Sequence, residues 1–184
     1  MLISAYNAEW PTHFENIYKK LLNILSGLTV NIEHIGSTAV PGLAAKPIID
    51  IDIIYHASSD FENIKNKLAI IGYYHNGNQD ATGREVFKRS GKIDDEVLDK
   101  IAHHLYVCRY DCAELHRHIL FRNYLRKYAI AREFYEHLKY EIAKEVKNDR
   151  KLYASNKELK ANSFINYIVE LSKSEHPPFG KIER

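Results

Sequence analysis

The 184-residue sequence lacks the features that would assign it to a membrane-spanning, secreted or disulfide-stabilised class. No apolar run reaches the roughly 18 residues of a membrane span. The opening stretch MLISAYNAEWP has neither the basic first segment nor the long apolar segment of a secretion signal. Cysteine is scarce. Cys108 and Cys112 are four residues apart in a chain without an export signal, which favours free thiols in a reducing compartment. These absences predict a cytoplasmic protein without a membrane partner.

The chain also has little excess charge of either sign. Lysine and arginine total 26, against 24 aspartates and glutamates, for a formal net charge of +2. General nucleic-acid binders usually carry a strong basic excess on one face, so the composition argues against that class. A local basic cluster could still bind one phosphate group. Nothing in the composition indicates an oligomeric state.

Hydrophobic spacing divides the chain into a mixed first part and a helical second part. We expect helices over 11–26, 61–71, 111–128, 131–147 and 156–172, and strands over 29–35, 48–54, 73–75, 85–89 and 102–109. Asp111 and Glu114 have the spacing of a capping box for the first C-terminal helix. The predicted organisation is an α/β core, about 1–110, with a helical region, 111–184, packed on it as one compact unit.

Two aspartates interrupt the apolar strand IIDIDII (48–54). Because strand side chains alternate, Asp50 and Asp52 share one face, and Ile49, Ile51 and Ile53 share the other. Neighbouring carboxylates repel each other unless a cation or good solvation compensates. Mg²⁺ is a natural partner because it prefers carboxylate and phosphate oxygens. The D-x-D pattern alone is more consistent with two solvated carboxylates on a half-exposed strand.

The loop before this strand strengthens the case for a site. Strand 29–35 runs into Gly36 and Ser37, followed by a stretch of small residues. Glycine allows close backbone approach, and free N–H groups in such a turn can bind a phosphate. The Ser37 hydroxyl can add a hydrogen bond. A Gly-Ser pair is weak by itself but much stronger when D-x-D follows on the next strand.

This arrangement resembles the nucleotidyltransferase superfamily, in which a Gly-Ser loop holds a nucleoside triphosphate and paired carboxylates hold a divalent metal. The longer string EHIGSTAVPGLAAKPIIDI (33–51) resembles the GrpB family, a branch of that superfamily. Similar pieces are YNAEWP (6–11), HHLYV (103–107), FRNYLR (121–126) and YASNKELKANSFI (153–165). The resemblance implies a nucleotidyltransferase-like mixed sheet flanked by helices, with a C-terminal helical bundle. Related domains fused to dephospho-coenzyme A kinase connect the family to coenzyme A metabolism by association only.

One departure concerns the third carboxylate that active nucleotidyltransferases usually carry on a later strand. If the apolar residues of 102–109 face the isoleucines of 48–54, His104 shares the face of Asp50 and Asp52. His104 could replace the missing carboxylate, which would suit Mn²⁺ or Zn²⁺ better than Mg²⁺. It could also act as a base near neutral pH, or only pack beside the sheet.

Basic residues supply candidate phosphate contacts. Arg122 and Arg126 lie four apart on one helix face, where paired guanidinium groups can grip phosphate or form a solvated basic surface. The GrpB-like string FRNYLR makes a site role for them as plausible as the surface one. Lys46, which could equally be a surface lysine, and Arg84 are further candidates.

Two functions follow from the resemblance. The first is a nucleotidyl- or phosphoryl-transferase that uses Mg²⁺ or Mn²⁺, held by Asp50 and Asp52, with His104 as a third catalytic residue. Its substrate contacts would be Gly36, Ser37, Lys46, Arg84, Arg122 and Arg126. The second is a non-catalytic module that binds a nucleoside triphosphate or another phosphorylated small molecule, and the missing third carboxylate favours it. Neither reading names the nucleotide or the acceptor.

Overall fold

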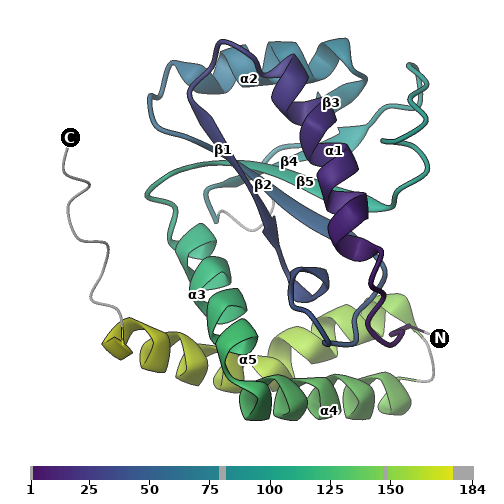
Figure 1. Ribbon diagram of the computed structural model, residues 1–184, viewed down its shortest axis with the longest axis vertical. Helices are drawn as coiled ribbons and strands as arrows, with labels where there is room; N and C mark the ends of the chain where they lie inside the picture. Colours follow the sequence, from purple (N-terminus) through teal and green to yellow (C-terminus); the bar gives the residue numbers. More distant parts are fainter. Residues whose placement is uncertain (1, 79–81, 147–148, 176–184) are drawn as a thin grey trace.

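The computed structural model describes residues 2–78, 82–146 and 149–175 (Figure 1). Its elements in chain order are α1 (Trp10–Ile24), β1 (Val30–Ile35), the 3₁₀ turn η1 (Ser37–Ala39), β2 (Ile49–Tyr55), α2 (Asp60–Ile70), β3 (Tyr73–His75), β4 (Arg84–Arg89), β5 (His103–Arg109), α3 (Ala113–Lys127), α4 (Ala129–Glu145) and α5 (Arg150–Glu175). In this part of the chain no helix has the length and apolar character needed to cross a membrane.

The strands of the described residues form one five-stranded sheet in the order β1-β2-β5-β4-β3. Strands β2 and β5 are parallel neighbours, whereas β1 with β2, β4 with β5 and β3 with β4 pair antiparallel. A parallel pair needs a crossover connection, and the stretch from α2 to β4 supplies it. The predicted fold class, a mixed sheet flanked by helices, is confirmed.

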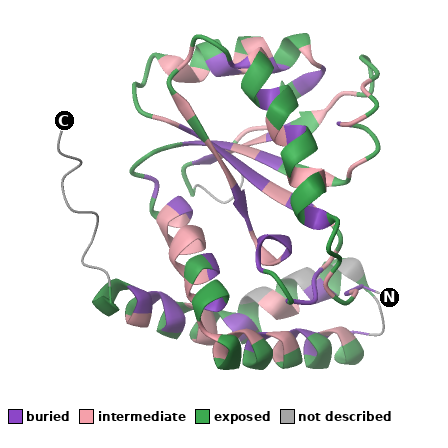
Figure 2. Ribbon diagram, in the orientation of Figure 1, coloured by how far each residue is buried: buried purple, intermediate pink, exposed green. Residues whose placement is uncertain are grey.

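One face of the sheet is sealed by α1 and α2. The isoleucines at 49, 51 and 53 are at most 1% exposed and pack with apolar residues of both helices. The alternation in β2 therefore places every second side chain in this core. Figure 2 shows buried residues along the central strands and on the sides of the two helices that face them.

Helices α3, α4 and α5 lie on the other side of the sheet (Figure 1). Besides contacting the strands, these helices pack against the loop that follows β1. Val40 and Leu43 of that loop pack against α3, α4 and α5, and Leu2 and Ile3 pack against the end of α4. The Gly36–Ser37 turn is therefore held between the sheet and the helical layer.

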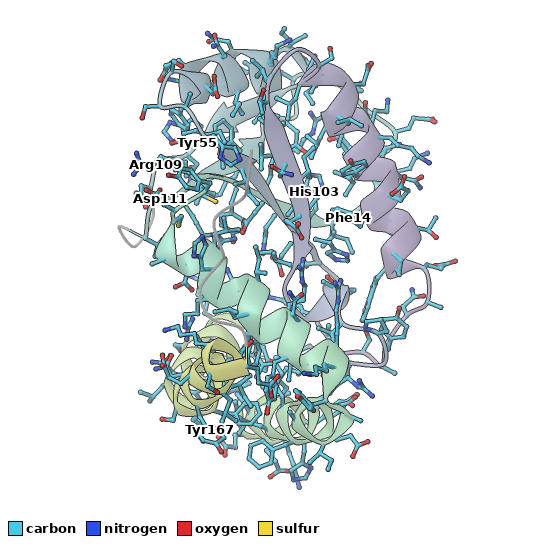
Figure 3. The ribbon with its side chains drawn as sticks, turned by 60° about the vertical axis from the view of Figure 1, so that its left-hand side comes forward. Phe14, Tyr55, His103, Arg109, Asp111 and Tyr167 are labelled. Atoms are coloured by element: carbon cyan, nitrogen blue, oxygen red, sulfur yellow. The ribbon has the colours of Figure 1, made fainter. Side chains whose placement is uncertain are left out.

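Two expectations about helix starts were wrong. Asp111 does not cap α3: the N-cap is Cys112 without a side-chain bond, and Asp111 forms an ion pair with Arg109 instead (Figure 3). Helix α5 begins earlier than predicted because the Asp149 carboxylate accepts the backbone N–H groups of residues 151 and 152. This is an aspartate N-cap that the hydrophobic spacing did not indicate.

Candidate functional site

A cavity of about 1100 Å³ lies between the sheet and the helical layer. Its wall includes the Gly36–Ser37 turn, side chains of β2, β4 and β5, and side chains of α3, α4 and α5. The cavity therefore lies on the face of the sheet that carries the polar residues of β2 and β5, where the sequence predicts the site.

Asp50 and His104 meet on the cavity wall. They are direct partners in the parallel pairing of β2 and β5, and His104 Nδ1 lies 2.9 Å from Asp50 Oδ1. The Asp50 side chain is 31% exposed and the His104 side chain 53%. His104 therefore shares the face of Asp50, as the alternation predicts.

The Gly36 turn approaches Asp50 more closely than any other residue type would allow. Gly36 has φ of +74°, and a Cβ built there would lie 2.5 Å from Asp50 Oδ2. A side chain at this position would need both a strained backbone and a displaced carboxylate. The glycine thus brings the Ser37 turn and the Asp50 carboxylate together.

Asp52 lies on the same face but is closed off from the cavity. Its side chain is 0% exposed and is not part of the cavity wall, and its Oδ1 accepts bonds from Arg84 Nη2 at 2.6 Å and Nε at 3.2 Å. Its Oδ2 is buried without a hydrogen-bond partner among the described residues. Burial raises the pKa of Asp52, and the neighbouring guanidinium opposes that shift. The guanidinium of Arg84, a residue predicted to contact substrate, forms an ion pair with the Asp52 carboxylate.

The donor set does not fit the expected two-carboxylate metal site. Asp50 is open to the cavity, but Asp52 presents no oxygen to it. Within the described ranges, no three or more His, Cys, Asp or Glu side chains are grouped so that they could hold a metal ion. Mg²⁺ is usually bound through one or two carboxylates together with phosphate oxygens and waters, so Asp50 alone would hold it only together with a phosphorylated ligand.

Lys139 of α4, which is not among the residues predicted from the sequence, reaches the Gly-Ser turn. It is 2% exposed, and its Nζ donates to Ser37 Oγ at 3.3 Å and to the Ala44 carbonyl. Burial lowers its pKa to about 7, with help from the nearby charge of Lys157. The signal was available: Lys139 follows Tyr135 and precedes Ile142 at helical spacing, a lysine within a buried stripe.

Cations dominate the cavity wall among the described residues. Eight lysines and arginines line it, against the two carboxylates Asp50 and Glu114. The arginines, each paired with a carboxylate, are Arg84, Arg89, Arg117 and Arg122. The lysines, for which the described residues show no such pair, are Lys46, Lys88, Lys139 and Lys157. Four lysines of the described wall therefore have no carboxylate partner that an anion would have to displace.

The two arginines of α3 differ in what they do. Arg122 is 8% exposed, and its Nη1 lies 2.6 Å from both Glu33 Oε2 and the His34 carbonyl, so it ties α3 to β1. Arg126 is exposed, donates to the Ala39 carbonyl at 2.8 Å, and is not part of the cavity wall. The structure brings Arg122 to the cavity edge but leaves Arg126 outside it.

The family model of the GrpB protein matches residues 1–170. The chain belongs to the GrpB family. It is 32% identical over 167 residues to the glutamate-rich protein GrpB of Alkalihalophilus pseudofirmus, covering 90% of this chain and 94% of that protein. The crystal structure of GrpB from Enterococcus faecalis superposes with a TM-score of 0.76 at 29% identity, over 95% of this chain and 98% of the other.

A wider likeness in fold connects this GrpB family member to Cid1. Cid1, solved in complex with the UTP analogue UMPNPP, matches with a TM-score of 0.53 and 13% identity, over 76% of this chain and 42% of Cid1. At that identity the match shows the fold alone. A 68-residue stretch, 35% of the chain, is 32% identical to dephospho-CoA kinase of Mycolicibacterium paratuberculosis and covers 17% of that enzyme.

Proposed function

We propose that the cavity binds a phosphorylated small molecule, with a nucleoside triphosphate as the first class to test. The observation that carries the proposal is the imbalance of charge around the Gly36–Ser37 turn. Four lysines of the described wall lack a carboxylate partner, and Lys139 is buried against the turn itself. A buried, unpaired ammonium is costly, and an anion beside it would offset that cost.

The residues at the turn would divide the binding between them. The Ser37 hydroxyl and the Lys139 ammonium would contact one phosphate group, since they already lie 3.3 Å apart. Lys46 and Lys157 on the same wall would neutralise further charge. Arg122 would act through position, because its bonds to Glu33 and to the chain before Gly36 hold the end of β1 in place.

A second candidate is nucleotidyl or phosphoryl transfer with Mg²⁺ or Mn²⁺, and the Asp50–His104 pair favours it. A carboxylate bonded to Nδ1 fixes the imidazole tautomer, and it leaves Nε2 as a base or ligand toward the cavity. When bound, a divalent cation would stabilise charge on the transferred group. Cid1, a neighbour in fold, has been solved with MgGTP and, as a point mutant, with MgATP.

Calorimetry separates these candidates. The four ribonucleoside triphosphates, inorganic triphosphate and dephospho-coenzyme A would each be titrated with EDTA, Mg²⁺ or Mn²⁺, followed by an assay for pyrophosphate release. We expect Lys139→Met to weaken binding at least ~10-fold, because a hydrogen bond to a charged group is lost. Lys144→Met, an exposed lysine of the same helix, is the matched control.

Binding without turnover supports the module, and turnover lost in Asp50→Asn supports the transferase. The absence of binding by every probe to the unmodified protein would end the proposal.

A further inference from the structure

We propose that Arg84 is a built-in cation for Asp52, so that the cavity takes its phosphorylated ligand without a divalent metal at this carboxylate. The inference rests on the proposed function for the identity of the ligand, but its metal part can be tested on the protein alone. It concerns the position where the nucleotidyltransferase resemblance implies a metal.

Arg84 is held against Asp52 from several sides. Two of its nitrogens donate to one Asp52 oxygen, and its guanidinium carbon lies 3.7 Å from the centre of the Tyr106 ring. The side chains of Arg84 and Asp52 are 10% and 0% exposed. A buried charge pair that is stacked as well as hydrogen-bonded does not exchange freely with ions from solvent.

The strand register explains how these groups come together. Asp52 on β2 is opposite Tyr106 on β5, which is opposite Val86 on β4. Arg84 is two residues before Val86, so its side chain leaves the same face of the sheet and reaches Asp52 over the ring. The middle strand therefore carries an aromatic platform beside Asp52. A carboxylate there would compete with Asp52 for the guanidinium.

A metal would have to displace a cation that cannot lose its charge. An arginine stays protonated in proteins, so Arg84 cannot make room by neutralising itself. Among the described residues the second Asp52 oxygen has no hydrogen-bond partner, yet Asp52 is buried and is not part of the cavity wall, so a hydrated ion in the cavity does not meet it. Glu114, the other carboxylate of the wall, is paired with Arg117 and with His118. Asp50, bonded to His104, is thus the one carboxylate of the described wall without an arginine partner.

The first measurement is a titration of the protein alone with Mn²⁺, in which electron paramagnetic resonance detects the bound ion. The samples are the unmodified chain, Arg84→Gln, Asp52→Asn and Asp50→Asn. We expect binding to the unmodified chain to be weak and unchanged in Asp52→Asn. We expect Arg84→Gln to bind Mn²⁺ at least ~10-fold more tightly, since the shorter side chain unpairs the Asp52 carboxylate and opens the space between it and the cavity. No gain in Mn²⁺ affinity in this variant would contradict the inference. A Mn²⁺ site in the unmodified chain that disappears in Asp52→Asn would overturn the inference.

The second measurement is binding of inorganic triphosphate to the unmodified chain in EDTA and in Mn²⁺. We expect binding in EDTA, and we expect any change of affinity on adding Mn²⁺ to be the same, within ~2-fold, in the unmodified chain and in Asp52→Asn, because Mn²⁺ chelated by triphosphate in solution then has no contact with Asp52. Binding that needs Mn²⁺ and is lost in Asp52→Asn contradicts the inference. If triphosphate binds under neither condition, the proposed ligand class is wrong, and the Mn²⁺ titrations alone still decide whether Arg84 excludes the metal.

Discussion

The two faces of the sheet are built from alternate residues of the same strands and do opposite things. On the α1 and α2 face, the β2 isoleucines are sealed in an apolar core. On the other face, the residues between them carry charge: Asp50 opens to a cavity and Asp52 is closed by Arg84. One face stabilises the fold, whereas the other maintains charged groups at the wall of a hollow space.

The difference shows how a small sheet can hold a polar site. Burying charge is costly unless each charge is paired and hydrogen-bonded. Within the described part of the wall, the arginines meet this condition through carboxylates, and the lysines do not. Apolar packing on the other face offsets the free-energy cost of burying these lysines without a partner. The unpaired lysines are therefore the groups left to bind a ligand. Substitutions on the two faces should therefore have separable effects.

The largest expected effect is on the sealed face. Ile51 is 0% exposed, so Ile51→Ala should destabilise the fold by about 2–5 kcal/mol through lost burial and a cavity. Urea titration measures this change. Triphosphate affinity of the folded protein, measured well below the unfolding midpoint, should stay within ~2-fold.

The control for this prediction is Ile70→Ala at the end of α2, where the side chain is 65% exposed. It should change stability by less than about 0.5 kcal/mol. If Ile51→Ala weakened ligand binding as much as stability, the two faces would not be separable.

An intermediate effect is expected at Gly36, which follows β1 and lies against Asp50 on the cavity face. Gly36→Ala forces a left-handed backbone on alanine and places its Cβ 2.5 Å from Asp50 Oδ2. Gly27 has a similar φ of +83° but no atom within 4 Å of the added Cβ. Each variant should lose about 1–3 kcal/mol of stability from the backbone alone.

Ligand affinity distinguishes these two variants. Only Gly36→Ala should weaken triphosphate binding, by at least ~10-fold, because it alone displaces the turn from the carboxylate. Calorimetry on both variants checks this. Equal losses of affinity would show that the close approach of Gly36 to Asp50 has no part in binding.

The features that depend on the two-residue alternation of strand side chains were predictable from the sequence. The five strands, the sharing of a face by Asp50 and Asp52, and the presence of His104 beside them all follow from a period of two. The GrpB-like string gave the fold class, and the family model confirms the membership. These features depend on neighbours along the chain or on one strand pairing.

The pairing of charges was not predictable, because it joins residues far apart in the chain. Arg84 and Asp52 are separated by 32 positions, and Lys139 and Ser37 by 102. The sequence shows that neighbouring carboxylates need a cation or good solvation but not which group reaches them, so Mg²⁺ was predicted at Asp52, where the structure has Arg84. The roles of Asp50, His104 and the basic residues remain predictions.

The most gradual expected effect is a pH dependence that comes from Lys139 on the cavity face. Burial lowers its pKa to about 7, so the ammonium that would bind phosphate loses its proton as the pH rises through that value. We expect triphosphate affinity to fall by up to ~10-fold per pH unit above pH 7, since binding then requires uptake of a proton. Calorimetry between pH 6 and pH 9 measures the slope. Lys139→Arg should flatten it, because a guanidinium stays charged throughout.

The same group fixes the sign of a stability change. A lysine in the unfolded chain has a pKa of about 10.4, so between pH 7 and about 10 the unfolded state binds more protons than the folded one. Stability in the absence of ligand should therefore rise with pH across this window, and the destabilisation by a buried ammonium should be fully present below it. Lys139→Met should remove that contribution, whereas Lys144→Met on the exposed side of α4 should keep it. A profile that is identical in all three proteins would mean that Lys139 keeps an ordinary pKa, and the charge facing Ser37 would then be fixed rather than responsive to pH.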